Sequence, residues 1–316
     1  MTQAFGYKSM LTVTLPVLNG MPYLSDALAS LETQTFRNFI VLFWDNGSTD
    51  GSVEEARQWI PSRLPGRVVS GIPLPLHECL ARMVEESDTE FCARMDADDI
   101  CLPERFRLQM EFMIEHPGID LVGTQIECID AEGKMLPTEE WAKYPLSHDE
   151  IISRLMILCP FNHPSILFRR KAILQAGSYS IPAPVEDLNL YLRLVRQSRV
   201  ANLSETCLRY RIHPRSICAA ANIGKQHETL ARESLVREAE GVFGIPSGVF
   251  RRLKMKEHSP SVNAIFKVAW YLSNHHLPHF WDIITSPTFL YSARCMTSPD
   301  DIFSKGIYKI LSMSKS

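Results

Sequence analysis

Phe91-Cys92-Ala93-Arg94-Met95-Asp96-Ala97-Asp98-Asp99 is a short, mostly apolar run that leads directly into three aspartates. The run has the length of a buried strand, and a helical pattern follows it from Pro103, with Phe106, Met110 and Met113 on one face. Carboxylates placed so close together repel one another, so the turn favours a bound cation as their common partner. Oxygen ligands on a short loop suit Mg²⁺ or Mn²⁺. A solvated acidic turn that caps the next helix is the alternative interpretation.

Upstream of the aspartates, strand and helix patterns alternate. The predicted strands are 11–15, 39–44 and, more weakly, 68–69, and the predicted helices are 24–33, 52–60 and 76–84. Such alternation is typical of an α/β fold with a mostly parallel sheet and helices on both faces. Right-handed crossovers place the carboxyl ends of the strands at one edge. The acidic turns 45–50 and 96–99 are therefore expected to face one ligand-binding crevice there.

Downstream of the aspartates, the alternation continues and then changes. Strands are predicted at 120–129 and 165–168, and helices at 151–156 and 186–197. Ser147 and Glu150 match a capping box at the start of the first of these helices. Beyond about Ala219 the strand signals fade and the chain looks helical to its end. The predicted organisation is one domain over residues 1–218 and a helical C-terminal extension over 219–316.

The composition is that of an ordinary globular enzyme. Of 316 residues, 45% are hydrophobic and 22% are charged, and the formal net charge of −3 lacks the basic excess of a nucleic-acid-binding protein. The 8 cysteines form no C-x-x-C pair, so their scatter suits reduced thiols in a cytosolic protein. Residues 1–7 do not resemble a signal peptide, and no apolar run reaches the roughly 18 residues of a spanning helix. A cytoplasmic protein is expected.

Short segments that follow one another in register resemble the family 2 glycosyltransferases, which have a GT-A fold. The segments are 15–20 (LPVLNG), 30–36 (SLETQTF), 45–50 (DNGSTD), 93–99 (ARMDADD), 162–165 (NHPS) with Glu186-Asp187, and 210–213 (YRIH). Together they extend over about residues 10–218, and the closest likeness is to bacterial enzymes that build capsular, exopolysaccharide or lipopolysaccharide chains. The resemblance implies a GT-A type nucleotide-binding sheet and a metal-dependent, hexosyltransferase-type transfer from a nucleotide sugar.

The resemblance also implies which residues hold the nucleoside, commonly uridine. The backbone around Pro16 and Val17 with the neighbouring Asn19, and the side chains of Asp45 or Asn46, would do so. Asn46 stands where relatives carry a second acid. Because an amide both donates and accepts hydrogen bonds, the identity of the base stays open. The alternative for this segment is an ordinary turn with local side-chain bonds.

Three further residues lie on the donor side by the same resemblance: Arg94, Asp96 and Ala97. Asp96 would face the ribose or the water ligands of the metal. Arg94 would meet a phosphate, although a strand arginine can equally pair with a neighbouring acid.

The metal ligands implied by the resemblance are Asp98 and His213, and the metal is Mn or Mg. His213 would complete the metal site or contact the diphosphate, whereas a lone histidine before a proline is more often structural or exposed. Asp99 is assigned less directly, and capping of the following helix is its alternative role.

Asp187 matches the catalytic base of the family. An inverting transfer needs a carboxylate across the anomeric carbon from the leaving diphosphate, where it takes the proton of the acceptor hydroxyl. The alternative is an acid that merely favours a helix N-terminus. Glu186 and His163 are assigned to the acceptor side, although His163 can also simply anchor the turn with Pro164.

Residues 219–316 lie outside the resemblance. Aromatic clusters at 266–271 and 280–281, with scattered lysines, are compatible with an interfacial helix on the inner membrane leaflet near a lipid-linked acceptor. A helical lid, a packing arm or a contact in a homo-oligomer are the alternatives, and we favour these because the basic residues are few.

The sequence therefore predicts an inverting glycosyltransferase whose partners are a nucleotide sugar donor and a saccharide or lipid-linked saccharide acceptor. A nucleotidyltransferase is one rival, but it would carry a basic glycine-rich loop after the first strand, where this chain has Asn19-Gly20-Met21-Pro22. An inactive sugar-binding or scaffold subunit is the other rival. The presence of both Asp98 and Asp187 argues against such decay.

Overall fold

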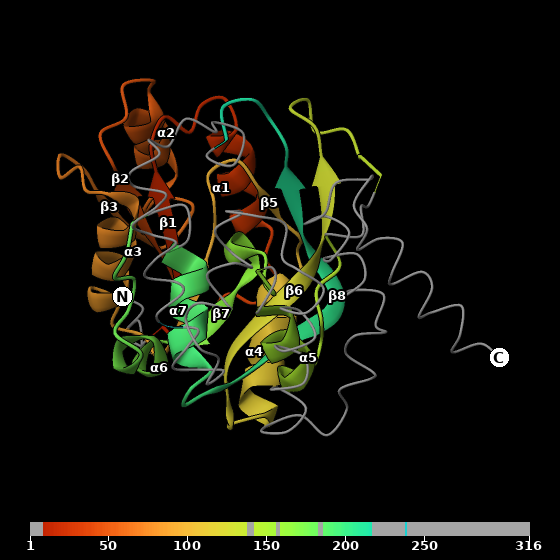
Figure 1. The fold of residues 1–316 in the computed structure, drawn as a ribbon. Coiled ribbons are helices and arrows are strands. Elements are labelled where there is room, and N and C mark those ends of the chain that lie inside the picture. Colours follow the sequence, from red (N-terminus) through yellow and green to blue (C-terminus); the bar gives the residue numbers. More distant parts are fainter. Residues whose placement is uncertain (1–8, 138–141, 156–158, 183–185, 217–237, 239–316) are drawn as a thin grey trace, which may run out of the picture.

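The computed structural model describes residues 9–137, 142–155, 159–182, 186–216 and 238. Eight strands form one sheet in the order β3-β2-β1-β4-β7-β6-β8-β5 (Figure 1). The strands are β1 Leu11–Val17, β2 Phe39–Asp45, β3 Gly66–Val69, β4 Phe91–Arg94, β5 Ile100–Cys101, β6 Ile119–Ile129, β7 Leu167–Arg169 and β8 Arg199–Arg211.

The strand directions bring six carboxyl ends to one edge of the sheet. β1 pairs in parallel with β2 and β4, and β2 pairs in parallel with β3. β7 is antiparallel to both β4 and β6, so β6 runs in the same direction as β4, and β8 is parallel to β6. The segments that follow β1, β2, β3, β4, β6 and β8 therefore all leave the sheet at the same edge.

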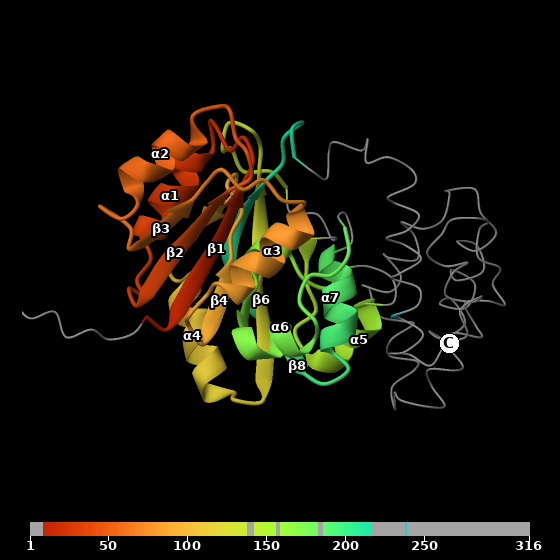
Figure 2. The same ribbon diagram turned by 90° about the vertical axis from the view of Figure 1, so that its left-hand side faces the viewer.

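Helices cover both faces of this sheet (Figure 2). They are α1 Leu24–Glu32, α2 Ser52–Trp59, α3 Leu76–Glu85, α4 Arg105–Glu115, α5 His148–Leu155, α6 Arg170–Gln175 and α7 Glu186–Leu194. Apolar side chains of α1, α2 and α4 are buried against Leu11, Val13 and Leu15 of β1. Those of α3, α5, α6 and α7 are buried with Cys92 and Phe168 on the other face. Burial of both faces explains why the central strands are continuous apolar runs.

The fold class predicted from the sequence is confirmed: the sheet is mixed but mostly parallel, and helices flank it. The strands expected at 11–15, 39–44, 68–69, 91–95 and 120–129 are β1, β2, β3, β4 and β6. The capping box is also confirmed, because the backbone N–H of Ser147 donates to Glu150 Oε2 at 3.0 Å and that of Glu150 donates to Ser147 Oγ at 3.4 Å.

The longest described strand, β8, has no counterpart in the sequence pattern. Two buried stretches, 200–203 and 207–208, are mostly apolar, but the exposed polar residues 204–206 separate them. The pairing with β6 shifts register near Gly123 and Gln125, which lets the polar stretch lie outside the regular alternation. The strand expected at 165–168 is displaced: residues His163–Ser165 form a 3₁₀ turn, and β7 begins at Leu167.

The C-terminal extension predicted over 219–316 lies outside the described residues apart from Glu238, and so do both aromatic clusters. Within the described part of the chain, no helix has the length and apolar character needed to cross a membrane. Membrane contact and self-association stay predictions.

Candidate active site

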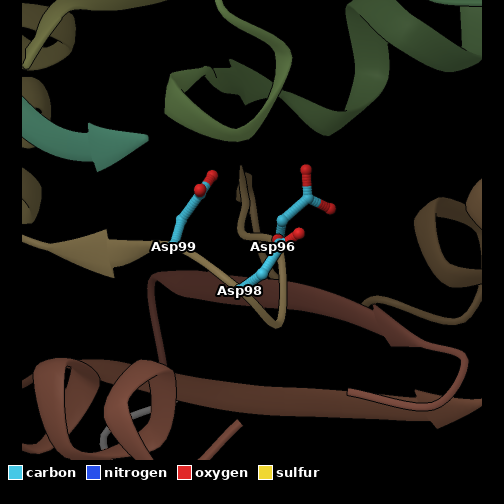
Figure 3. A group of neighbouring side chains, drawn as sticks. All are labelled: Asp96, Asp98 and Asp99. Carbon is cyan, nitrogen blue, oxygen red and sulfur yellow. The ribbon is translucent and has the colours of Figure 1, made fainter. Parts of the chain in front are cut away.

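Three aspartates lie together at the carboxyl edge of the sheet (Figure 3). Asp96, Asp98 and Asp99 come from the turn between β4 and β5, and one carboxylate oxygen of each lies within 4.8 Å of the others. The turn after β1 packs against them: a Cβ added to Gly20 would lie 3.1 Å from the Cβ of Ala97. The turns that follow β1 and β4 are therefore in contact.

His213 reaches the aspartates from the end of β8. Its Nε2 lies 2.9 Å from Asp98 Oδ2, and its ring packs against Tyr23 with 4.7 Å between centroids. The His213 side chain is 6% exposed, whereas that of Asp98 is 29% exposed. The structure thus brings together the two residues assigned to the metal, and it leaves the Asp98 carboxylate open to solvent on one side.

Asp99 is fully buried and does not cap the helix that follows. Its Oδ1 accepts the backbone N–H of Arg211 at 2.9 Å, and the N-cap position of α4 is Glu104. Its Oδ2 is buried and has no hydrogen-bond partner among the described residues. Burial, reinforced by the charges of Asp98 and Asp96, raises the pKa of Asp99 well above its ordinary value. The capping interpretation is therefore wrong, because the side chain points toward β8.

Arg211 fixes the aspartate turn, a role that the sequence did not indicate. Its Nε donates to the carbonyl of Asp98 at 2.8 Å, and its Nη2 forms an ion pair with Asp26 at 3.0 Å. The guanidinium also lies over the ring of Tyr23 at 4.6 Å. Arg211 is 2% exposed, and its side chain connects β8 to the aspartate turn and to Asp26 of α1.

Arg94 pairs with Asp96, with 2.5 Å between Nη2 and Oδ1. It also donates to the carbonyl of Met95, and its residue exposure is only 3%. Of the two roles considered for Arg94, the structure shows the pairing with a neighbouring acid rather than a side chain directed at a phosphate. Burial raises the pKa of Asp96, and the nearby Arg94 partly offsets that increase.

Side chains of the segment 30–36 form hydrogen bonds with the main chain that follows the aspartate turn. Ser30 Oγ accepts the backbone N–H of Cys101 at 3.0 Å. Gln34 donates to the carbonyl of Leu102 at 2.8 Å and accepts the N–H of Phe106 at 3.2 Å. This explains the Ser-Leu-x-x-Gln-Thr pattern, because both polar side chains satisfy the main chain where the turn enters α4.

The residues of the turn fit a divalent cation. They offer clustered carboxylate oxygens, which Mg²⁺ and Mn²⁺ prefer, and His213 adds a nitrogen at the Asp98 carboxylate. The unpartnered Oδ2 of Asp99 and the raised pKa values of Asp96 and Asp99 show a surplus of negative charge that a cation would stabilise.

Side-chain hydrogen bonds hold the first acidic turn, residues 45–50. Asp45 accepts the backbone N–H of Ser48 at 2.9 Å, and Asn19 Oδ1 accepts that of Thr49 at 2.9 Å. Asn46 does not point toward open space: its amide pairs with the main chain of Leu74. The bond between Asp45 and Ser48 is local, as in the alternative interpretation, whereas Asn19 and Asn46 bond to residues far from them in the sequence. The turns after β1 and β2 are also joined by the main chain, because the carbonyl of Val17 accepts the Asn46 N–H at 2.7 Å.

Two neighbouring acids begin α7, the buried Glu186 and the partly buried Asp187. Asp187 Oδ1 accepts the N–H of Leu188 at 2.6 Å, and the thiol of Cys159 lies 3.6 Å from its Oδ2. Burial raises the pKa of Asp187, against the lowering effect of those two bonds. Burial and then the charge of Asp187 raise the pKa of Glu186 to about 7. Glu186 Oε2 is buried without a hydrogen-bond partner among the described residues.

Electrostatic contacts link these acids to the aspartate turn. The charge of Arg94 lowers the pKa of both Asp187 and Glu186, and that of Asp96 raises the pKa of Glu186. The topology agrees, since α7 ends shortly before β8 begins, so its N-terminus lies back toward the edge at which β8 ends. The two acidic groups therefore share one side of the molecule.

His163 lies in the 3₁₀ turn before β7, at the same edge. Its Nε2 is 2.8 Å from the hydroxyl of Tyr179. Burial, followed by the charge of Arg94, lowers the pKa of His163 well below its usual value, so the imidazole is neutral. Burial raises the pKa of Tyr179, whose charged neighbours include Asp187 and Glu186. Tyr179 was not singled out by its sequence, and only the fold places it here.

Residues 12–177 match the family described as Glycosyl transferase family 2. The chain belongs to this family. The glycosyltransferase is 35% identical over 191 residues to the amylovoran biosynthesis glycosyltransferase AmsE of Erwinia amylovora, covering 60% of this chain and 70% of that protein. It is 29% identical over 212 residues to the O-antigen biosynthesis glycosyltransferase WbnJ of Escherichia coli, covering 66% and 81%.

Solved structures of similar fold include S. aureus TarS 1–349 in complex with UDP-GlcNAc. Its TM-score is 0.63 at 15% identity, and the match covers 91% of this glycosyltransferase and 90% of that chain. The mannosyltransferase PcManGT from Pyrobaculum calidifontis, in complex with GDP-Man and Mn²⁺, matches with a TM-score of 0.53 at 17% identity over 97% and 81%. These likenesses establish the GT-A fold.

Proposed function

We propose that this glycosyltransferase is an inverting, metal-dependent enzyme that moves a sugar from a nucleoside diphosphate, UDP by preference, to the hydroxyl of a saccharide acceptor. One observation carries the proposal: the aspartate turn lies at the carboxyl edge of the sheet, and α7, which begins with Glu186 and Asp187, has its N-terminus toward the same edge. Carboxylates suited to a cation and a separate carboxylate suited to a proton thus lie on one side of the molecule.

Asp187 acts as the base of this proposal. Its Oδ1 is held by the N–H of Leu188, which fixes the carboxylate at the first turn of α7. Within the part of the chain that the structure describes, its Oδ2 lies beside the weakly donating thiol of Cys159, so we assign to this oxygen the proton of an incoming hydroxyl. The raised pKa makes the carboxylate a stronger base than an exposed aspartate.

The aspartate turn serves the donor. Asp98, with Asp96, Asp99 and His213, would hold a Mn²⁺ or Mg²⁺ ion, which when bound stabilises the negative charge of a leaving diphosphate. Arg94 holds Asp96, and Arg211 holds the turn itself, so the chain presents these oxygens in a fixed arrangement. Val17 and the turn at Asp45 would lie beside the nucleoside.

The acceptor class follows from the relatives. AmsE and WbnJ are named for amylovoran and O-antigen biosynthesis, so we infer a step of surface polysaccharide synthesis with a saccharide or lipid-linked saccharide acceptor. Glu186, His163 and Tyr179 would line the acceptor side. The enzyme would then work in the cytoplasm, at most peripherally on the inner membrane face.

A donor panel tests the proposal. With Mn²⁺ present, a UDP-sugar is expected to raise the melting temperature of the full-length chain and to be hydrolysed slowly, with release of the nucleoside diphosphate. EDTA should abolish both effects. NMR of the transferred sugar should show an anomeric configuration opposite to that of the donor. Retention of configuration would rule out the inverting assignment, and release of pyrophosphate from a sugar phosphate and a nucleoside triphosphate would instead indicate a nucleotidyltransferase.

The pH dependence of kcat should reflect the acids of α7. Because the base must be ionised, activity is expected to rise as pH increases through the pKa of Asp187, which burial raises above the ordinary 3.8. Burial and the charge of Asp187 raise the pKa of Glu186 to about 7, so Glu186 is mostly protonated below that pH. The folded protein binds the proton of Glu186 more tightly than the unfolded chain, in which the pKa of this carboxyl is 4.5. The contribution of Glu186 to the free energy of unfolding therefore falls as pH rises from about 4.5 to 7.

Glu186→Gln separates the two carboxyls in this experiment. Glutamine resembles the protonated form of Glu186, so the rising limb of the kcat profile should persist in the variant. Loss of that limb in Glu186→Gln would mean that Glu186, rather than Asp187, is the base.

A further inference from the structure

Asn46 directly follows β2 and forms hydrogen bonds with the loop that leads into α3. Its Nδ2 donates to the carbonyl of Leu74 at 2.6 Å, and its Oδ1 accepts the N–H of the same residue at 2.8 Å. Nearby, Trp44 Nε1 donates to the carbonyl of Ile72 at 3.2 Å. The loop 70–75 is thus tied to the end of β2 by two side chains, and the Asn46 amide makes a two-way pairing like that of a neighbouring strand.

Only an amide can make this pairing. It requires one donor and one acceptor on the same planar group, and a carboxylate supplies acceptors alone. Aspartate at position 46 would keep the bond from the Leu74 N–H but would place a negative oxygen against the Leu74 carbonyl. The asparagine found here is therefore matched to the conformation of the loop.

The loop held by Asn46 lies beside the turn that follows β1. The backbone N–H of Asn46 donates to the carbonyl of Val17 at 2.7 Å. Leu18, the residue after Val17, is 60% exposed, and Ile72 of the loop is 51% exposed. Apolar side chains commonly line small-molecule sites. Asn46 is hydrogen-bonded to both segments, to the turn after β1 through its backbone N–H and to the loop 70–75 through its side-chain amide.

We propose that Asn46 is a positioning residue that sets the loop 70–75 as one wall of the nucleotide site and does not read the base itself. The inference rests on the proposed function, since it presumes a nucleotide at this edge. A side chain that hydrogen-bonds a base discriminates strongly between bases. A side chain that preorganises a loop strengthens the binding of every nucleotide alike.

The test compares Asn46→Asp with Asn38→Asp, which makes the same chemical change just before β2, at its opposite end. Calorimetry with Mn²⁺ present gives the Kd of UDP and of GDP. Asn46→Asp should weaken both by about tenfold, the effect of one lost buried bond, and leave their ratio unchanged. Hydrogen exchange of residues 70–75 should increase in the same variant, and Asn38→Asp should match the unaltered chain in both measurements.

A second variant, Trp44→Phe, loosens the same loop without altering Asn46. It should also weaken both nucleotides in the same ratio, and it carries the test if Asn46→Asp does not fold. A changed UDP-to-GDP ratio in Asn46→Asp would show direct reading of the base and overturn the inference, as would unchanged affinities for both. If the unaltered chain binds neither nucleotide, the proposed function falls as well, so the two failures are distinguishable.

Discussion

Asp187→Asn is expected to reduce sugar transfer by roughly 10²–10⁴-fold, the usual contribution of a positioned general base, while nucleotide binding persists. Asparagine keeps the size of the side chain and the bond from the Leu188 N–H, but it cannot take a proton from the acceptor. Steady-state rates at saturating donor and acceptor, together with the Kd for UDP, give both parts of the result.

Asp149→Asn is the matched control for this experiment. Asp149 is an exposed acid in the first turn of α5, as Asp187 is an acid in the first turn of α7. If Asp187 only favoured the helix N-terminus, the two substitutions would have similar, small effects on stability and neither would stop transfer. Normal turnover by Asp187→Asn would therefore remove Asp187 from the reaction and leave it the helix-terminal role.

The sequence predicted the donor side of the fold because each strand there is a compact apolar run that ends in a polar turn. Leu11–Val17 and Phe39–Asp45 are buried along almost their whole length. The aspartates after β4 could then be placed at the carboxyl edge by topology alone. What the structure adds at this edge is the contact of Gly20 with Ala97, which depends on side-chain packing.

The other half of the sheet was harder to predict, since its longest strand is polar in the middle. Residues 204–206 are exposed, so β8 lacks the continuous apolar signal of a buried strand. Because β8 could not be predicted, the sequence did not indicate that Arg211 and His213 lie beside the aspartate turn. The sequence could therefore name His213 by resemblance, but it could not show that Arg211 clamps the turn.

The contacts of single side chains were the least predictable feature. Asn46 was assigned to the nucleoside by resemblance of the segment 45–50 to the family, yet its partner, Leu74, is set by how the loop 70–75 folds back. The thiol beside Asp187 is similar, since Cys159 is distant in sequence and belongs to no recognisable motif. Local pattern specifies elements and turns, whereas such pairings arise from tertiary packing.

Asp98→Asn is expected to lower the affinity for Mn²⁺ by more than the 10–100-fold that loss of an outer-shell partner typically costs. The side chain of Asp98 is 29% exposed, and His213 Nε2 lies 2.9 Å from its Oδ2 and so orients the carboxylate. An amide oxygen in its place can still meet His213, so the fold should be kept while the negative charge is lost. Electron paramagnetic resonance of Mn²⁺ measures binding without reference to turnover.

Asp120→Asn provides the matched control, because Asp120 lies near the start of β6 and hence at the opposite edge of the sheet. Its Mn²⁺ isotherm should equal that of the unaltered chain. An unchanged isotherm in Asp98→Asn would mean that the aspartate turn holds no cation through this residue, and the carboxylates would then be stabilised by protein groups such as Arg94 at Asp96 and the Arg211 N–H at Asp99. The experiment therefore decides between a metal site and an internally neutralised turn, the two arrangements that three adjoining carboxylates allow.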